Sequence, residues 1–279
     1  MSQKSYDGSA SLYLIPTPIG NLDDITVRSL KTLSEVDLIL CEDTRETGKL
    51  LKKYEIKKRL ISCHEFNEDK IKSEVVGWLQ DGLTLGLVTD QGTPIVSDPG
   101  YTVVSEVIKR GFNVISLPGA TAFVPALTCS GIDPAPFLFY GFLNSKDSKQ
   151  VEELKRLKSL KFTLIFYEAP HRIKKTLTNM LEVFGDRSIS INREISKIHE
   201  EIYRDKISNL IDICDTMKGE MVIIVEGNKD IVDYSGLSIV EHVKIYTDDG
   251  ISEKDAIKLV AKERNVPKSV IYKAYHIDN

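Results

Sequence analysis

The 279-residue sequence lacks the signatures that identify several common classes of protein. None of its four cysteines stands in a CxxC pair, so the spacing of a zinc ribbon or a thioredoxin-type redox motif is missing. GxGxxG and GxxxxGK[ST] are also missing, which weakens a Rossmann dinucleotide-binding or P-loop interpretation. Neither histidine–glutamate pair extends to HExxH, so nothing supports a zincin, and we expect no metal site.

The sequence also lacks a net positive charge and long apolar runs. The 37 Lys and Arg residues are outnumbered by 41 Asp and Glu residues, for a net charge of −4, so any nucleic-acid contact must come from a local patch. No run approaches the ~20 apolar residues that span a bilayer, and residues 1–10 do not resemble a signal peptide. We therefore expect a cytoplasmic protein with no membrane segment and with reduced, partly buried cysteines.

What the sequence does contain is the pattern of an α/β protein. Short apolar runs alternate with segments of helical period, as in sheets with helices on their faces; the first such helix has Val27, Leu30 and Leu33 on one side. A Gly- and Pro-rich segment at 130–136 favours a domain boundary. We predict α/β domains at 1–131 and 132–232 and a small, helix-turn-helix-like tail at 233–279. The expected strands are 12–15, 36–40, 60–62, 83–89, 114–117, 137–142, 162–167, 189–192, 201–203 and 221–226.

The loops after these strands are where an open parallel sheet binds ligands. Residues 16–21 follow the first strand, and Gly20 would let the backbone approach an anionic group or serve an ordinary turn. Residues 89–100 carry two carboxylates. Asp90 is placed to reach a ribose hydroxyl or a cationic ligand, whereas Asp98, with Pro99 after it, is expected to cap the next helix. Residues 117–122 form a third turn of small residues with room for a flat ring.

The second half of the chain repeats this arrangement. Residues 167–172 place a carboxylate, an imidazole and a guanidinium after one strand, a grouping that favours a catalytic or phosphate-binding role. The charged run 193–201 follows another strand and is either a solvated face or a substrate-facing loop. Residues 144–175 are locally basic, typical of an exposed amphipathic helix or of an RNA-docking patch.

Seven motifs in a fixed order resemble those of the small-subunit ribosomal RNA 2′-O-cytidine methyltransferases, a family of the tetrapyrrole methylase superfamily. The resemblance covers about residues 13–226 and is weaker in the tail. Thr89 and Gln91 depart from the pattern, since Ser and Ala are commoner there, and Gln91 brings a larger polar side chain near the cofactor. The motifs are YLIPTPIGNL (13–22), CEDTR (41–45), TDQGTP…SDPG (89–100), PGAT (118–121), FYEAPHR (166–172), REISK (193–197) and GEMVIIVE (219–226).

This resemblance implies two α/β domains with S-adenosylmethionine in the cleft between them, a homodimer, and as substrate a decoding-site cytidine in small-subunit rRNA or a ribosomal particle. Residues implied to face the RNA are Glu42, Asp43, Arg45, His171 and Arg172. Residues implied to line the methyl-donor pocket are Thr17, Pro18, Gly20, Asp90, Gly92, Thr93, Pro94, Gly119, Ala120, Thr121, Tyr167, Glu168, Ala169 and Pro170.

Methyl transfer from a sulfonium requires the acceptor oxygen in line behind the methyl carbon, so positioning can supply up to about 7 to 11 kcal/mol. A ribose hydroxyl reacts poorly until its proton leaves, so a Lys of lowered pKa or a nearby carboxylate would add roughly 10²- to 10⁴-fold. We expect Lys197 or Glu194 to take that proton. Arg45, Arg172 and Arg193 would hold phosphates, and Arg193 is counted with the catalytic residues. Because RNA is read best where bases are splayed, we expect the target nucleotide to leave its stack.

Two other functions account for the same motifs. A small-molecule methyltransferase acting on a tetrapyrrole would need the same fold and cofactor loops. A non-catalytic ribosome-assembly factor that retains the pocket would tolerate loss of Asp90 or Lys197. The basic patch and the charged motifs at 42–45 and 193–194 favour RNA.

Overall fold

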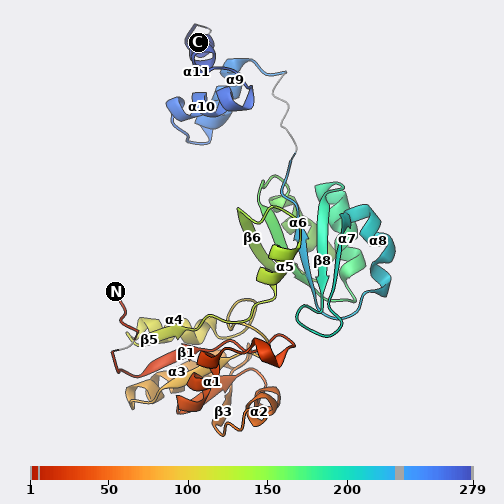
Figure 1. Cartoon of the computed structure of the whole chain (residues 1–279). Helices are drawn as coiled ribbons and strands as arrows, with labels where there is room; N and C mark the ends of the chain where they lie inside the picture. The colour runs from red at the N-terminus through yellow and green to blue at the C-terminus, as the bar shows by residue number, and fades with distance from the viewer. Residues whose placement is uncertain (1, 6, 230–235, 278–279) are drawn as a thin grey trace. The chain divides into compact units, whose positions relative to one another are not determined.

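The structure is a computed structural model that describes residues 2–5, 7–229 and 236–277 (Figure 1). The chain divides into two compact units, 1–228 and 229–279, and each is described by itself. The expected boundary at 232–233 lies outside the described residues. No described helix is both long and apolar enough to cross a bilayer.

The first unit opens with a five-stranded parallel sheet of order β3-β2-β4-β1-β5. Successive strand residues point to opposite faces, so Leu38 and Leu40 pack under α3 and α4 while Ile39 and Cys41 pack under α1 and α2. The strands are β1 (Ser11–Leu14), β2 (Leu38–Cys41), β3 (Arg59–Ser62), β4 (Leu85–Val88) and β5 (Asn113–Ser116), and the helices are η1 (Leu22–Asp24), α1 (Val27–Glu35), α2 (Thr44–Lys53), α3 (Glu68–Gln80) and α4 (Tyr101–Lys109).

Two local predictions for this sheet were wrong. Val27 is 85% exposed, because it is the first residue of α1 and lies beyond the buried face that Leu33 occupies. Asp98 does not cap α4, which begins after Gly100 with no side-chain cap of its own. Instead Glu68 of α3 accepts hydrogen bonds from the Gly100 amide (2.8 Å) and the Thr102 hydroxyl (2.6 Å), leaving the Asp98 carboxylate available elsewhere.

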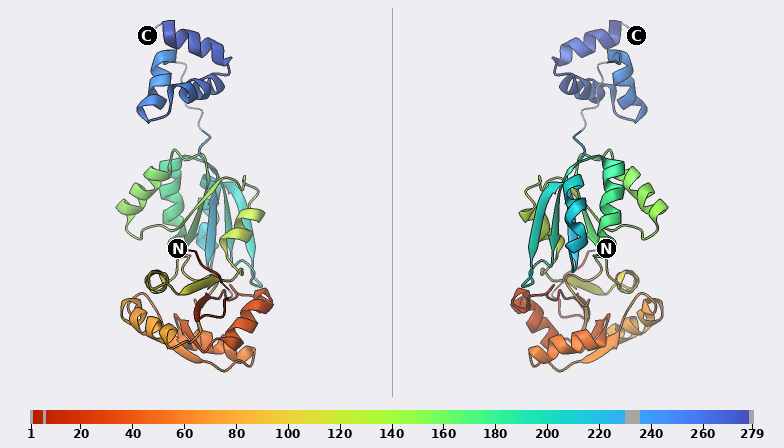
Figure 2. Two further views of the ribbon diagram at one scale, coloured as in Figure 1. Left: turned by 90° about the vertical axis from the view of Figure 1, so that its left-hand side faces the viewer. Right: turned by 90° about the vertical axis from the view of Figure 1, so that its right-hand side faces the viewer.

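The second sheet has the order β6-β7-β10-β8-β9 and is mixed. One face packs on α6, α7 and α8, as the 3.6-residue spacing of Ile173, Leu177 and Met180 predicts. Figure 2 shows these helices flanking the sheet. The strands are β6 (Phe137–Phe142), β7 (Thr163–Glu168), β8 (Ser188–Arg193), β9 (Glu201–Lys206) and β10 (Met221–Val225), and the helices are α5 (Phe123–Cys129), α6 (Asp147–Leu157), α7 (Ile173–Phe184), α8 (Ile207–Ile213) and η2 (Cys214–Thr216).

Strand direction in this sheet decides where its polar side chains meet. Strand β10 lies between β7 and β8 and is antiparallel to both, so β7 and β8 run the same way. Met221, the first residue of β10, pairs with Glu168 at the end of β7 and with Arg193 at the end of β8. The segments that follow β7 and β8 and the segment that precedes β10 therefore lie at the same end of the second sheet.

Helix α5 packs on the second sheet, where Ala126 and Leu127 meet Ile165, Val222 and Ile224. A boundary at residue 131 would assign this helix to the first domain, whereas its packing places it with the second sheet. The division into domains at 1–131 and 132–232 therefore remains a prediction.

The unit 229–279 is helical, as expected for the tail. Val260 and Ala261 of α10 (Glu253–Glu263) and Ile271 of α11 (Lys268–Ile277) lie in its core. A further helix, α9 (Ile239–Asp248), was not predicted; Ser238 and Glu241 form a capping box at its start.

Candidate active site

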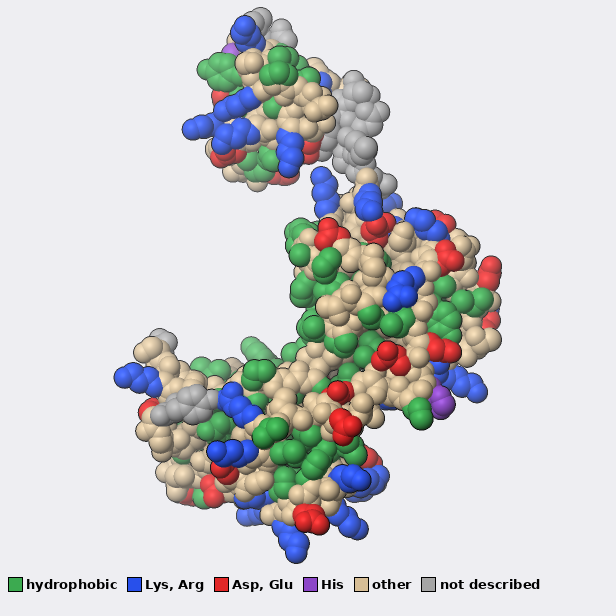
Figure 3. Space-filling model, viewed as in Figure 1, with side chains coloured by type: hydrophobic (Ala, Val, Ile, Leu, Met, Phe, Trp, Pro, Cys, Tyr) green, Lys and Arg blue, Asp and Glu red, His purple; other side chains and the backbone are tan. Residues whose placement is uncertain are grey.

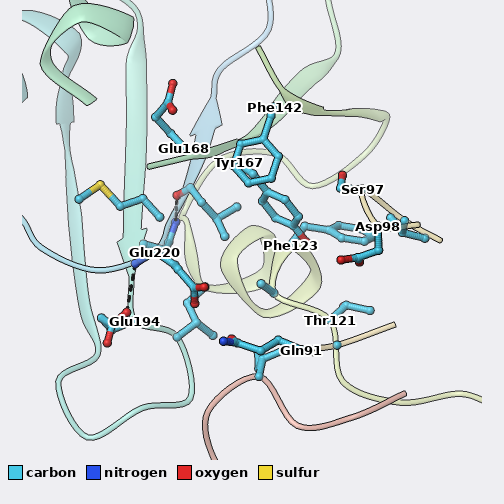
Figure 4. Close-up of a pocket in the computed structure, with 18 of the residues that line it drawn as sticks. Gln91, Ser97, Asp98, Thr121, Phe123, Phe142, Tyr167, Glu168, Glu194 and Glu220 are labelled. Carbon is cyan, nitrogen blue, oxygen red and sulfur yellow. Dashed lines mark hydrogen bonds between the residues drawn. The ribbon is translucent and has the colours of Figure 1, made fainter. Parts of the chain in front are cut away.

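A cavity of about 510 Å³ lies between the two sheets of the first unit, a size ordinary for a small-molecule or cofactor site. The loops that follow β1, β2, β4 and β5 form one side of it, and the end of the second sheet where β7 and β8 finish and β10 begins forms the other. Figure 4 shows side chains from both sides. Its walls contain Ile19, Glu42, Asp90, Gln91, Gly92, Thr93, Val96, Ser97, Asp98, Thr121, Ala122, Phe123, Phe142, Tyr167, Glu168, Ala169, Pro170, Asn192, Glu194, Ile195, Lys197, Glu220, Met221 and Val222.

The three predicted loops of the first sheet are tied to one another on one side of this cavity. Thr17 and Gly92 exchange backbone hydrogen bonds of 2.9 and 3.1 Å, and the Thr17 hydroxyl, which is buried, donates to the Thr89 carbonyl. The Thr93 hydroxyl donates to the Ala120 carbonyl over 3.0 Å. Thr17 and Ala120 thus join the loops without lining the cavity themselves. Pro18 and Pro94 are buried and do not line it either.

Gly119 supports the same arrangement by its missing side chain. A Cβ at this residue would stand 2.4 Å from Cβ of Pro16, a separation that real atoms do not tolerate. The third loop can therefore lie directly against the first only because residue 119 is glycine.

The floor on the first-sheet side is acidic. Buried Thr89 places its hydroxyl 3.1 Å from Glu42 Oε2 and 3.0 Å from Asp98 Oδ1, and Asp90 accepts from the amide of Asp43 at 3.2 Å. Burial, together with the charges of Glu42 and Asp90, raises the pKa of Asp98 to about 6. Burial also raises the pKa of Asp90, helped by the neighbouring carboxylates. In the described part of the chain, no three His, Cys, Asp or Glu side chains form a group that could hold a metal ion.

An aromatic wall stands beside these acids, where Phe123, Phe142 and Tyr167 lie together (Figure 4). The Tyr167 ring packs edge-on against Phe142, with centroids 5.5 Å apart, and Phe123 stacks on Phe139 at 4.7 Å. Burial raises the pKa of Tyr167 to about 12, so its phenol stays neutral. The wall offers flat apolar surface suited to a planar ring.

The opposite wall contains Lys197, which has carboxylates on two sides. Its Nζ lies 3.0 Å from Glu194 Oε1 and 2.9 Å from Glu220 Oε2. Burial alone would lower the pKa of Lys197, but hydrogen bonds to Glu220 and Glu194 outweigh burial and raise it. The lowered pKa expected for a lysine base was therefore wrong: Lys197 is a paired cation.

Glu194 is the other member expected to take a proton. Burial favours its neutral form, yet hydrogen bonds from Lys197 and from the Glu220 amide outweigh burial and lower its pKa. Figure 4 marks the bond between the Glu220 backbone and Glu194. Both residues thus face the cavity in their ionised forms.

Glu168 and Arg172 are engaged inside the protein. The carboxylate of Glu168 is 1% exposed, accepts from the Thr176 hydroxyl at 2.5 Å and pairs with Arg172 Nε at 3.2 Å. Arg172 also donates to the carbonyls of Leu143 and Asn144. In Figure 4 the Glu168 carboxylate points away from the aromatic wall. This pair joins β7 and α7 to the segment after β6.

Other expected RNA contacts lie outside the cavity. Asp43 caps α2 by accepting from the Arg45 amide, as a carboxylate-rich turn predicts, and also pairs with the Arg45 guanidinium, which is 83% exposed. His171 is exposed. Arg193 donates to the Lys218 carbonyl and pairs with Glu201, so it holds the strand edge together. Acidic side chains are visible where the two halves of this unit meet (Figure 3).

Several wall residues were not singled out from the sequence. Glu220, Met221 and Val222 precede or begin a strand that runs opposite to its neighbours, so a search after strand ends overlooks them. Phe142 and Asn192 are the last residues of expected strands, and Phe123 is the first residue of α5. The sequence analysis gave Asp98 only a capping role, although Asp98 belongs to the same motif, TDQGTP…SDPG, as the predicted pocket residue Asp90.

Comparison with known proteins supports what the fold indicates. The family model described as Tetrapyrrole (Corrin/Porphyrin) Methylases matches residues 11–211. Crystal structures of uroporphyrin-III-C-methyltransferase from Thermus thermophilus (TM-score 0.56, 16% identity, covering 81% of this chain and 97% of that one) and of cobalt precorrin-4 methyltransferase (TM-score 0.58, 18% identity, 81% and 98%) share the fold. At such identities the likeness extends to the fold alone.

Sequence relatives are closer. A protein named Ribosomal RNA small subunit methyltransferase I from Bacillus subtilis (strain 168) is 46% identical over 286 residues, covering 99% of this chain and 98% of the relative. One of the same name from Thermotoga maritima is 43% identical over 221 residues, covering 78% of this chain and 99% of the relative. The chain therefore belongs to the tetrapyrrole methylase family, and within it to the ribosomal RNA small subunit methyltransferase I proteins.

Proposed function

We propose that the protein transfers a methyl group from S-adenosylmethionine to the ribose 2′-oxygen of a decoding-site cytidine in small-subunit rRNA. The observation that carries this proposal is the 40–46% identity, over nearly the whole chain, to relatives named as rRNA methyltransferases. The proposal includes a homodimer acting in the cytoplasm, as the motifs imply.

The cavity fits the cofactor in size and chemistry. The aromatic wall suits an adenine ring, and the excess of carboxylates suits a ligand that carries a positive sulfonium. The loops that contain Thr17, Gly92 and Thr121, together with Tyr167 and Ala169, would hold it. When bound, S-adenosylmethionine supplies an electrophilic methyl group with a neutral thioether as leaving group.

The protein's own contribution is largely positioning. The Thr17 and Thr93 hydroxyls tie together the loops of the first sheet. These loops, with the facing end of the second sheet, would hold the acceptor oxygen in line with the methyl carbon. Lys197 supplies a fixed positive charge at this wall, held by Glu194 and Glu220. Because the cavity walls are acidic, the RNA phosphates stay outside while the ribose enters.

The RNA backbone would then contact cations around the entrance. Exposed Arg45 and His171 remain candidates for this contact, as does the basic segment 144–175, which includes α6. Arg172 and Glu42 are not part of this outer contact. Arg172 is engaged in its ion pair with Glu168, and Glu42 lies on the cavity floor.

The test is a transfer assay with methyl-labelled S-adenosylmethionine. Small ribosomal subunits and naked rRNA, both lacking ribose methylation, are compared with a uroporphyrinogen-type tetrapyrrole. Label in RNA alone supports the proposal. Label in the tetrapyrrole alone contradicts it in favour of the small-molecule alternative, and cofactor binding without transfer to any of them favours an assembly factor.

A further inference from the structure

The proposed reaction, on which this inference rests, releases the proton of a ribose hydroxyl inside the cavity. Neither residue first expected to take it is suited to do so. Lys197 already holds its proton between two carboxylates, and Glu194 accepts hydrogen bonds from Lys197 Nζ and from the Glu220 amide. A carboxylate so engaged is a weak base.

The floor of the cavity contains a better acceptor. Asp98 and Glu42 both line the cavity, and the buried hydroxyl of Thr89 lies within hydrogen-bond distance of each, 3.0 and 3.1 Å away. A threonine hydroxyl has one hydrogen, so it can donate to only one of two ionised carboxylates. The contact with the other carboxylate becomes a hydrogen bond only when that carboxyl carries a proton and donates it to the Thr89 oxygen.

The surroundings make Asp98 the member that takes this proton. Burial raises its pKa to about 6, with the facing charges of Glu42 and Asp90 adding to burial and the Thr89 hydrogen bond opposing it. Near pH 7 the group is therefore mostly ionised and still a far stronger base than an ordinary carboxylate. Because Glu68 caps α4, Asp98 has no capping duty that would prevent this role.

We propose that Asp98 is the catalytic base, with Thr89 and Glu42 as the positioning residues that complete a hydrogen-bonded chain once it is protonated. As the oxygen–methyl bond forms, the methyl–sulfur bond breaks and its electron pair stays on sulfur. The oxygen–hydrogen bond breaks at the same centre, and its proton moves to Asp98. The protonated carboxyl then donates to Thr89, which donates to Glu42.

The first test needs neither cofactor nor turnover. Carboxyl ¹³C signals of aspartate-labelled protein are followed between about pH 4 and pH 8, with Asp98→Asn identifying the Asp98 signal. The expected signal titrates near the raised pKa of about 6. Thr89→Val should move that midpoint upward, because the Thr89 hydrogen bond favours the ionised form. An Asp98 signal titrating below about pH 4.5, the range of ordinary carboxyls, would overturn the proposal.

The second test is the pH dependence of turnover on RNA, with saturating substrates. Wild-type kcat should rise with pH through about 6 and then level off. Asp98→Asn should lower kcat by roughly 10²- to 10⁴-fold and remove that rise, while its melting temperature stays near that of wild type. Asp69→Asn, on the exposed start of α3, is the matched control.

These experiments distinguish a wrong assignment of the base from a wrong proposed function. If wild type methylates RNA and Asp98→Asn keeps both its kcat and its acidic limb, the base assignment is wrong while the function stands. If wild type does not methylate RNA, the proposed function fails, and with it the inference, whatever the carboxyl signal shows.

Discussion

The stem of Lys197 occupies the space that a side chain on Gly20 would need. A Cβ at residue 20 would lie 2.3 Å from Lys197 Cγ and 2.8 Å from its Cε. Gly20 lies in the segment after β1 of the first sheet, and Lys197 lies in the segment after β8 of the second. A hydrogen bond from Ser196 to Asp24 joins these two segments. Gly20, named first as a cofactor contact, thus sets where the Lys197 ammonium lies.

Gly20→Ala is expected to lower methyl transfer about 10²-fold, the scale of a 1 Å misplacement in an active site. It should displace Lys197 and strain a backbone that has φ of +141°. Turnover and the melting temperature are measured together. Gly77→Ala in α3, where the new Cβ would meet nothing within 4 Å outside its own stretch of helix, is the control and should keep full activity. Normal turnover in Gly20→Ala would show that Lys197 need not stay in place.

Lys197 is expected to work as a cation, so turnover should not climb as pH rises from about 7 to 9.5. A lysine base would have to lose its proton first, and the rate would then increase about tenfold per pH unit below its pKa. Hydrogen bonds to Glu220 and Glu194 raise the pKa of Lys197 despite its burial, which keeps it charged over this range. Such a climb, lost in Lys197→Met, would restore the lysine as base.

Removing one member of the Glu168–Arg172 pair should destabilise the unit 1–228. Glu168→Ala leaves the largely buried Arg172 guanidinium without its only charged partner in the described part of the chain, which costs about 3–5 kcal/mol when a buried pair is broken. Chemical denaturation measures this loss. His171→Ala, at an exposed neighbour, should stay within about 0.5 kcal/mol of wild type. If Arg172→Ala weakened RNA binding but left stability unchanged, an RNA contact would replace the structural role.

The helical unit 229–279 should lose stability as pH falls below about 6.5. Arg264 Nε donates to His242 Nδ1 over 3.0 Å, so His242 is neutral and gives its Nε2 proton to Glu263. Burial lowers the pKa of His242 from 6.5, outweighing Glu263. The unfolded chain therefore binds a proton first, and this stability is present above pH 6.5 and lost as pH falls through the lowered pKa.

Amide signals of α9 and α10 during melting between about pH 5 and pH 8 measure this effect. His242→Gln should flatten the pH dependence, whereas His276→Gln, at an exposed histidine, should leave it in place. Equal melting at both ends of the range would show that His242 is not kept neutral by the fold.

The strands could be predicted from the sequence because buried runs such as Leu85–Val88 and Met221–Val225 are continuously apolar. Once the parallel strands are predicted, the loops after their carboxyl ends are the expected ligand-binding positions. Asp90, Thr93 and Thr121 were predicted as site residues in this way, and all three line the cavity. Local rules also sufficed for the Asp43 cap on α2.

What could not be predicted depends on partners distant in the sequence. Glu220 reaches Lys197 because β10 is antiparallel between β7 and β8, and no local pattern reports strand direction. Asp98 was misassigned because Glu68, 32 residues away from Gly100, takes over the cap. The raised pKa of Lys197 likewise depends on two carboxylates whose positions only the folded sheet establishes.

The central claim, methylation of one ribose 2′-oxygen, is tested most directly by alkaline hydrolysis of rRNA from small subunits treated with the protein and S-adenosylmethionine. A 2′-O-methyl group removes the nucleophile that cleaves the neighbouring phosphodiester. The account predicts one new gap in the hydrolysis ladder, 3′ to a single decoding-site cytidine, that is absent without cofactor. An unchanged ladder despite methyl incorporation would place the methyl group on a base and contradict it.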